Sequence, residues 1–248
     1  MKLAVFSVTL LSQAFASPVV VRETTETFTH EAAWSASTKL NPPFPIHESC
    51  NSTLSNQLSL ALEETVVLAR HAKEHILRWG NKSPFVEKYF GNGTTAAAVG
   101  VYERVVSADR GDMLFRCDDP DKNCVTQNDW AGHWRGENAT AETVICDASF
   151  RKRRWLSSLC GGGYTVVQSP LNTYWAVDLL HRLLHVPNIS EGVVEHFAED
   201  YAGILELAKE GKGETLFDSD ALQYFAVDVY AYDIAAPGVG CSGEIEEK

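Results

Sequence analysis

Apolar positions recur at intervals of three and four residues from Thr53 to Trp79, and Gly80 follows the last of them. This spacing predicts an amphipathic helix that ends at the glycine. The same periodicity recurs in four later segments, namely 96–106, 171–186, 192–210 and 218–234. The C-terminal third of the chain is therefore expected to be mainly helical.

Short strands are expected where the periodicity stops, at 113–117 and 143–146. The turn-rich segment 118–123 follows the first of them. Residues 164–167 form either a last strand or the approach to the next helix. We find no internal repeat or low-complexity segment, so the pattern predicts a helix-dominated α+β fold in one domain over 39–242.

The first residues combine a lysine, an apolar run over 3–11 and the sequence Ala14-Phe-Ala16. A basic start, a short apolar stretch and a small-residue cleavage site are typical of a secretory signal peptide, here over 1–16. The run is shorter than the roughly 20 residues that span a bilayer. No later segment is long and apolar enough to do so. We therefore expect a secreted, extracellular protein without a membrane span.

The two ends of the mature chain are expected to lie outside the domain. Residues 17–38 are rich in Thr and Glu and weakly apolar, which predicts a flexible arm. Residues 243–248 form an acidic tail without histidine, where carboxylates would hold only hard cations weakly. Any tight metal binding is therefore expected at one internal site.

Six cysteines behind a signal peptide indicate three disulfides. Their spacing suggests local loops Cys117–Cys124 and Cys146–Cys160, which leaves Cys50–Cys241 to join the ends. A thiolate zinc site is the alternative. It is disfavoured because the chain has no C-x-x-C pair and the expected compartment is oxidising.

Sequons mark exposed positions that a secreted protein can carry as glycosylated asparagines. The chain has five of them, at Asn51, Asn81, Asn92, Asn138 and Asn188. The formal net charge of −12 argues against nucleic acid or an anionic membrane as a partner and favours a cation.

His181 and His185 are four residues apart in a helical, leucine-rich segment that stops before Pro187. Both imidazoles therefore leave one helix face about one turn apart, where they can share a tetrahedral Zn²⁺. Asp178 lies on nearly the same face and is expected to orient a ligand ring. Spacing alone is weak evidence in a chain with eight histidines.

His71 and His75 have the same spacing in the first predicted helix. Charged residues surround this pair, and no third ligand is evident nearby. We therefore interpret it as part of a solvated helix face. The surrounding charges are Arg70, Lys73, Glu74 and Arg78.

The segment His181-Arg-Leu-Leu-His185 resembles the motif of the fungal HRxxH family of peptidase-like secreted proteins. Further segments are similar to this family, namely LNPPFP at 40–45, RCDDPDKNCVT at 116–126, AGHWRG at 131–136 and DVYAYD at 228–233. The resemblance covers about 38–242. It implies a zincin-like fold, because the family is distantly similar to the deuterolysin-type zinc peptidases.

Those peptidases carry HExxH and a later aspartate ligand before an Asn-Ala-Asp-x-x-x-Tyr-Phe-like segment. Here Asp218-Ser-Asp-Ala-Leu-Gln-Tyr-Phe-Ala226 stands at the corresponding place. The resemblance then places the third ligand at about His196. The alternative ligands within reach are Glu195, Glu199 and Asp200. If His196 is not a ligand, we expect it to form a surface pair with Asp200.

Arg182 stands where zinc peptidases have the glutamate that deprotonates the zinc-bound water. A guanidinium has no acceptor and stays protonated, so it cannot act as this base. Its charge also repels a metal unless an acid compensates it, and Asp178, Glu195 or Glu199 are candidates.

Two functions therefore remain open. In the first, which the resemblance to pH-regulated antigens implies, the protein captures zinc outside the cell. It then returns the ion to a cell-surface transporter or meets host surface proteins. In the second, it is a rewired zinc peptidase that uses another carboxylate as base. The sequence carries no indication of oligomeric state.

Overall fold

The computed structural model describes residues 44–127 and 130–244. The predicted signal peptide at 1–16, the arm at 17–38 and most of the acidic tail lie outside the described residues. The helices are α1 Ser52–Trp79, α2 Pro84–Phe90, α3 Ala96–Ser107, α4 Asn123–Thr126, α5 Asp147–Lys152, α6 Trp175–Leu184, α7 Pro187–Ser190, α8 Tyr201–Glu210 and α9 Ser219–Tyr230, which runs into a π-helical turn at Ala231–Ala235. The strands are β1 Leu114–Arg116, β2 Gly132–Trp134 and β3 Glu142–Ile145.

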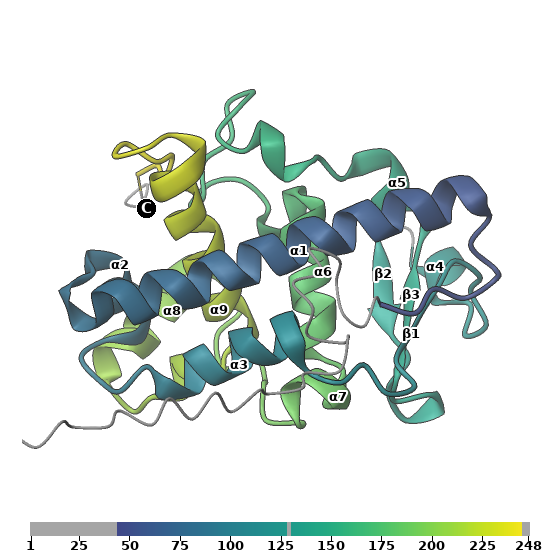
Figure 1. Ribbon diagram of the computed structural model, residues 1–248, viewed down its shortest axis with the longest axis horizontal. Coiled ribbons are helices and arrows are strands. Elements are labelled where there is room, and N and C mark those ends of the chain that lie inside the picture. The colour runs from purple at the N-terminus through teal and green to yellow at the C-terminus, as the bar shows by residue number, and fades with distance from the viewer. Residues whose placement is uncertain (1–43, 128–129, 245–248) are drawn as a thin grey trace, which may run out of the picture. The chain divides into compact units, whose positions relative to one another are not determined.

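The longest helix, α1, crosses the whole described domain and packs on α3, α6 and α9 (Figure 1). Asn51 caps its first turn, since its side-chain oxygen accepts hydrogen bonds from the amides of Thr53 and Leu54. Gly80 ends it with a φ of 49°, a backbone conformation that favours glycine. One apolar face of α1 is buried along nearly its full length. The helix therefore acts as the support on which the C-terminal helices assemble.

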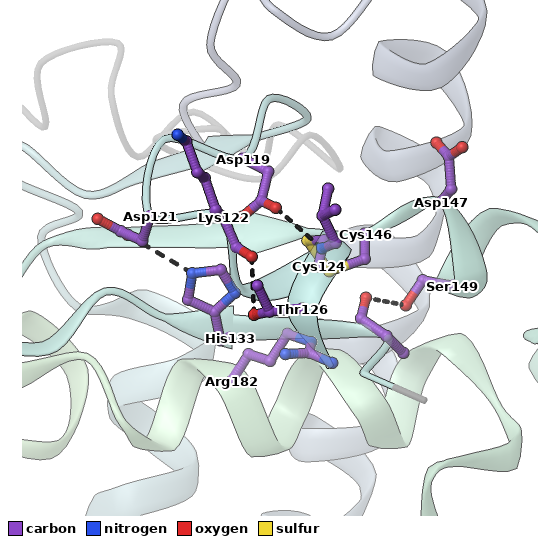
Figure 2. Close-up of a disulfide and its surroundings, with 12 residues drawn as sticks. Asp119, Asp121, Lys122, Cys124, Thr126, His133, Cys146, Asp147, Ser149 and Arg182 are labelled. Carbon is purple, nitrogen blue, oxygen red and sulfur yellow. Dashed lines mark hydrogen bonds and ion pairs between the residues drawn. A yellow bond between two sulfur atoms is a disulfide. The ribbon is translucent and has the colours of Figure 1, made fainter. Parts of the chain in front are cut away.

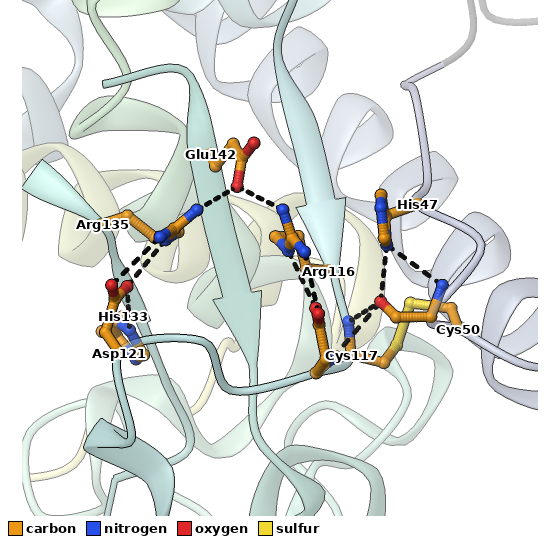
Figure 3. A network of polar contacts seen from close by, with 10 residues as sticks. His47, Cys50, Arg116, Cys117, Asp121, His133, Arg135 and Glu142 are labelled. Carbon is orange, nitrogen blue, oxygen red and sulfur yellow. Dashed lines mark hydrogen bonds and ion pairs between the residues drawn. A yellow bond between two sulfur atoms is a disulfide. The ribbon is translucent and has the colours of Figure 1, made fainter. Parts of the chain in front are cut away.

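The small sheet has the strand order β1-β3-β2. β1 runs parallel to β3, and β2 runs antiparallel to it. The carboxylate of Glu142 on β3 accepts hydrogen bonds from Arg116 at 2.8 Å and from Arg135 at 2.6 Å (Figure 3). Because Arg116 ends β1 and Arg135 follows β2, one acidic side chain links all three strands.

The helices predicted at 53–79 and 96–106 and the strands at 113–117 and 143–146 are confirmed to within a few residues. The prediction of a helix over 192–210 is wrong in its first half, because α8 begins only at Tyr201. Strand β2 was not predicted. Residues 164–167 form no strand, although Val166 and Val167 donate hydrogen bonds to the carbonyls of Cys241 and Ser242.

The predicted pairing of the cysteines is wrong at every bond. The structure joins Cys50 to Cys117, Cys124 to Cys146 and Cys160 to Cys241. The predictions Cys117–Cys124 and Cys146–Cys160 assumed that neighbours in sequence are neighbours in space, and Cys50–Cys241 was the pair that remained.

Backbone pairing of distant segments explains the observed disulfides. Ile46 forms a parallel bridge with Phe115, which brings the chain before Cys50 beside the end of β1. The pairing of 166–167 with the C-terminal segment likewise brings Cys241 beside Cys160. Figure 2 shows the Cys124–Cys146 bond against the sheet.

Four of the five sequon asparagines are exposed, and Asn188 is half-buried near Gly111. Glycosylation at these positions stays a prediction. Within 44–127 and 130–244, no helix is both long and apolar enough to cross a membrane.

Loss of the Cys160–Cys241 bond should destabilise the protein more than loss of the Cys124–Cys146 bond. The two bonds close segments with separations of 81 and 22 residues. Loop entropy predicts losses of about 4.5 and about 3.4 kcal/mol respectively for paired Cys→Ala variants. Urea denaturation of both variants measures the difference. A non-reducing peptide map that joins Cys50 to Cys241 would contradict the arrangement.

Candidate metal centre

Helix α6 carries the first two histidines and is almost entirely buried. Val177, Leu180 and Leu184 occupy its core-facing positions and have no exposed surface. His181 and His185 remain half-buried on the one face that borders a cleft. The helix ends at Leu184 with His185 as its C-cap, and Pro187 begins α7 as its first residue. The leucine-rich flanks thus place two imidazoles at the surface of a rigid, buried helix.

The structure brings His196 to this pair. Its Nε2 lies 3.1 Å from Nε2 of His185, which in turn lies 3.2 Å from Nε2 of His181. A tetrahedral zinc with Zn–N bonds of about 2.0–2.1 Å holds its ligand atoms about 3.3 Å apart. The spacing of the three nitrogens therefore fits one shared ion.

The segment that carries His196 is irregular and is tied to the start of α9. Glu195 forms an isolated parallel bridge with Asp218. Its amide donates to the carbonyl of Phe217 at 2.9 Å, and its carbonyl accepts from the amide of Ser219 at 2.8 Å. The Asp218 carboxylate accepts from the amides of Phe197 at 2.7 Å and Ala198 at 3.1 Å. Its other oxygen caps α9 by accepting from Ala221 at 2.7 Å. Asp218 is 0% exposed, so one buried carboxylate fixes both the loop and the helix.

Burial keeps the two helical histidines neutral. It lowers the pKa of His181 to about 3 and that of His185 to about 4. The neighbouring imidazoles and the guanidinium of Arg182 act in the same direction. A metal needs the neutral form of an imidazole, and both rings are in that form at ordinary pH.

The first turns of α9 contact the outer nitrogen of His181, a contact that the sequence did not predict. Its Nδ1 lies 2.9 Å from the amide of Gln223 and 3.3 Å from the hydroxyl of Ser219. The carboxylate of Asp220 lies 3.9 Å from Nδ1 of His181 and 3.7 Å from Nδ1 of His196. Burial raises the pKa of Asp220 to about 6. These groups face the side of the rings that a metal on Nε2 leaves free.

The other acidic residues named from the sequence lie elsewhere. Glu195, Glu199 and Asp200 are exposed, and the group of donor atoms within 4.8 Å of one another comprises the three histidines. Asp200 caps α8 by accepting from the amide of Gly203 at 2.7 Å. His196 therefore faces the cleft rather than forming a surface pair with Asp200.

Asp178 does not orient a histidine ring. It accepts from Arg182 at 2.9 Å, and Arg153 lies 3.1 Å from its other oxygen. Burial raises its pKa, but the two guanidinium groups outweigh burial and hold the pKa of Asp178 below its usual value. The candidate role of Asp178 as the acid that compensates Arg182 thus agrees with the observed contacts.

Arg182 points from α6 toward the sheet (Figure 2) and is 6% exposed. A side chain at Gly132 of β2 would place its Cβ 2.9 Å from the guanidinium carbon. Because glycine has no side chain, strand β2 can pack directly on Arg182 at this position.

A cleft of about 650 Å³ opens between α6, the start of α9 and β2. The three histidines, Asp220 and Gln223 line one side. The other side is formed by Trp130, Ala131, Gly132, His133 and Trp134. The ring of His133 also lies near Cys124 and Cys146, but their sulfurs are joined in a disulfide and are not free ligands.

The chain is similar to known proteins over most of its length. The family described as "HRXXH: Putative peptidase family" matches residues 1–244. The chain belongs to this family. It is 58% identical to the major allergen Asp f 2 of Aspergillus fumigatus over 81% of this chain and 64% of that protein. It is 51% identical to the pH-regulated antigen PRA1 of Candida albicans over 81% of this chain and 67% of that protein.

Protein ZPS1 of Saccharomyces cerevisiae is more distant, with 35% identity over 82% of this chain and 81% of that protein. The zinc peptidase from Grifola frondosa has a similar fold, with a TM-score of 0.51 over 72% of this chain and 97% of that chain. Its sequence identity is 15%, so this likeness concerns the fold alone. The predicted zincin-like, helix-dominated fold is therefore confirmed.

Replacement of Asp218 by alanine should weaken zinc binding without removing a ligand. The variant loses the two hydrogen bonds that hold the His196 segment, and partners of this kind are typically worth 10- to 100-fold in affinity. Asp200→Ala is the matched control, because it also removes a helix-capping carboxylate but leaves the His196 segment untouched. Competition with a chromophoric chelator measures both affinities. Equal affinity in Asp218→Ala and the native protein would show that this carboxylate does not position His196.

Proposed function

We propose that this protein is secreted and captures zinc outside the cell, with one ion held by His181, His185 and His196, and that it does not cleave peptides. The convergence of three Nε2 atoms supports the zinc site. The disulfides and the signal-like first residues support an extracellular place of action.

The observation that carries the non-catalytic part of the proposal is the position of Arg182. A peptidase needs a carboxylate there to take a proton from the zinc-bound water. Here the side chain is a guanidinium that turns away to Asp178 and the sheet. It offers no acceptor at any accessible pH.

The other carboxylates of the cleft do not supply a substitute base. In the described residues that line the cleft they are Asp178 and Asp220. Two arginines engage Asp178. Asp220 approaches the Nδ1 atoms of two ligands, whereas the metal would lie at Nε2 on the far side of each ring. Asp220 is thus placed to orient the ligands rather than to activate water.

When bound, Zn²⁺ would supply a Lewis-acidic centre with one position left open by three histidine ligands. The residues themselves provide three neutral donors, an outer layer of hydrogen-bonding groups and a cleft that admits exchangeable ligands. This set is suited to taking up an ion and releasing it to another protein. We further propose that the protein delivers its zinc to a cell-surface transporter or contacts host surface proteins.

Loss of one histidine ligand should weaken the binding of one zinc ion per chain. The apparent free energy of zinc binding at a structural site is about 10–16 kcal/mol. Divided among the four coordination positions of the ion, it gives about 3 kcal/mol per ligand, which corresponds to roughly a hundred-fold in affinity. Metal analysis and zinc titration of His196→Ala measure the loss, with His47→Ala as a control histidine away from the cleft. Unchanged stoichiometry and affinity in His196→Ala would rule out the three-histidine site.

Zinc-loaded native protein should show no more cleavage of a generic protein substrate than the same protein with its metal chelated. His185→Ala serves as the second blank in a casein digestion followed by electrophoresis. Cleavage that depends on zinc and disappears in His185→Ala would favour the alternative function, a rewired zinc peptidase.

A further inference from the structure

A second histidine cluster lies on α1, far from α6 in sequence. His71 and His75 are one turn apart, and Asp233 in the π-helical turn faces both of them. One carboxylate oxygen, Oδ2, lies 2.9 Å from Nε2 of His71 and 2.7 Å from Nδ1 of His75. In Figure 1 this C-terminal turn, drawn in yellow, stands beside α1. Three potential metal donors therefore converge from two elements.

The interpretation of this pair as a solvated face is wrong. His75 is 5% exposed, and the rings of Phe85 and Phe225 meet it edge-on with centroids 5.9 Å away. Tyr230 packs in the same way on His71 at 5.4 Å. The charged neighbours on α1 point elsewhere, and α9 with its π-helical extension covers the histidine face. Both rings are thus held in place by packing.

Asp233 lacks a permanent cation as partner. Its side chain is 25% exposed, and its ion pairs within the described part of the chain are those with His71 and His75. A neutral imidazole donates a hydrogen bond but carries no charge to balance a partly buried carboxylate. A divalent cation between the three side chains would supply that charge.

Ser83 determines which nitrogen of His75 faces the carboxylate. Its hydroxyl lies 2.7 Å from Nε2 of His75 and caps α2 by accepting from the amides of Phe85 and Val86. Nδ1 is therefore the nitrogen presented to Asp233. With a metal on Nδ1, Nε2 keeps its proton and donates a hydrogen bond to the hydroxyl of Ser83. Histidine ligands of metals commonly make an outer hydrogen bond of this kind.

We propose that His71 Nε2, His75 Nδ1 and Asp233 Oδ2 form a second zinc site, separate from the cleft. Two imidazoles and one carboxylate are a donor set that suits Zn²⁺, with water in the fourth position. Ligands of a tetrahedral zinc lie about 3.3 Å apart, so the carboxylate must move by about half an ångström from its present hydrogen bonds. The half-buried Asp233 side chain can move that far by rotating. Under this proposal the protein has two internal zinc sites, where the sequence led us to expect one.

The test is a zinc titration of the full chain that carries His185→Ala, in which the cleft site is weakened by roughly a hundred-fold. One zinc ion per chain should still bind. Adding Asp233→Asn, which keeps the size of the side chain but removes its charge, should weaken that binding by about a hundred-fold. His71→Ala in the same background should do the same, and it serves where Asp233→Asn disturbs folding, which circular dichroism of the metal-free protein reveals.

Glu74→Gln is the matched control. It removes one negative charge from the same turn of α1, but Glu74 is exposed and contacts none of the three donors. Zinc binding in this variant should equal that of His185→Ala alone. The proposal is overturned when His185→Ala binds no zinc, or when Asp233→Asn and His71→Ala leave its binding unchanged. The variant Asp233→Asn, with the cleft histidines intact, should still bind one zinc ion in the cleft. The two proposed sites can therefore be tested independently of each other.

Discussion

The buried ion pair between Arg182 and Asp178 is the interaction on which the character of the cleft depends. Both side chains are almost fully enclosed, and Arg153 shares the same carboxylate. Removal of one partner from a buried pair costs about 3–5 kcal/mol, so this arrangement resists rearrangement. It holds the guanidinium against Gly132 of β2. The position that carries the catalytic glutamate in zinc peptidases is thus occupied by a guanidinium that is fixed in an ion pair.

The three histidines owe their geometry to elements that are distant in sequence. Helix α6 supplies two of them because its remaining faces are buried against α1 and α9. The third depends on Asp218, which ties its segment to the start of α9 through two backbone amides. Three disulfides brace the domain that holds these parts together.

Local signals in the sequence predicted most of the helices, two of the three strands and the pair His181 and His185. The resemblance to the deuterolysin-type zinc peptidases supplied His196. What failed depended on contacts between distant segments. The disulfide pairs follow from backbone pairing that spacing does not encode. The outer partners Ser219, Asp220 and Gln223 share one face of α9, but only the packing of α9 on α6 relates them to a ligand. The burial of His75 likewise reflects a turn that begins more than 150 residues later.

The most direct test of the account is a crystal structure of the zinc-loaded protein, with the ion located by its anomalous scattering. The account predicts a zinc ion in the cleft at about 2.0–2.1 Å from Nε2 of His181, His185 and His196, while Arg182 remains paired with Asp178. A zinc ion coordinated instead by Glu195 or Glu199, with a carboxylate placed to deprotonate its bound water, would contradict it.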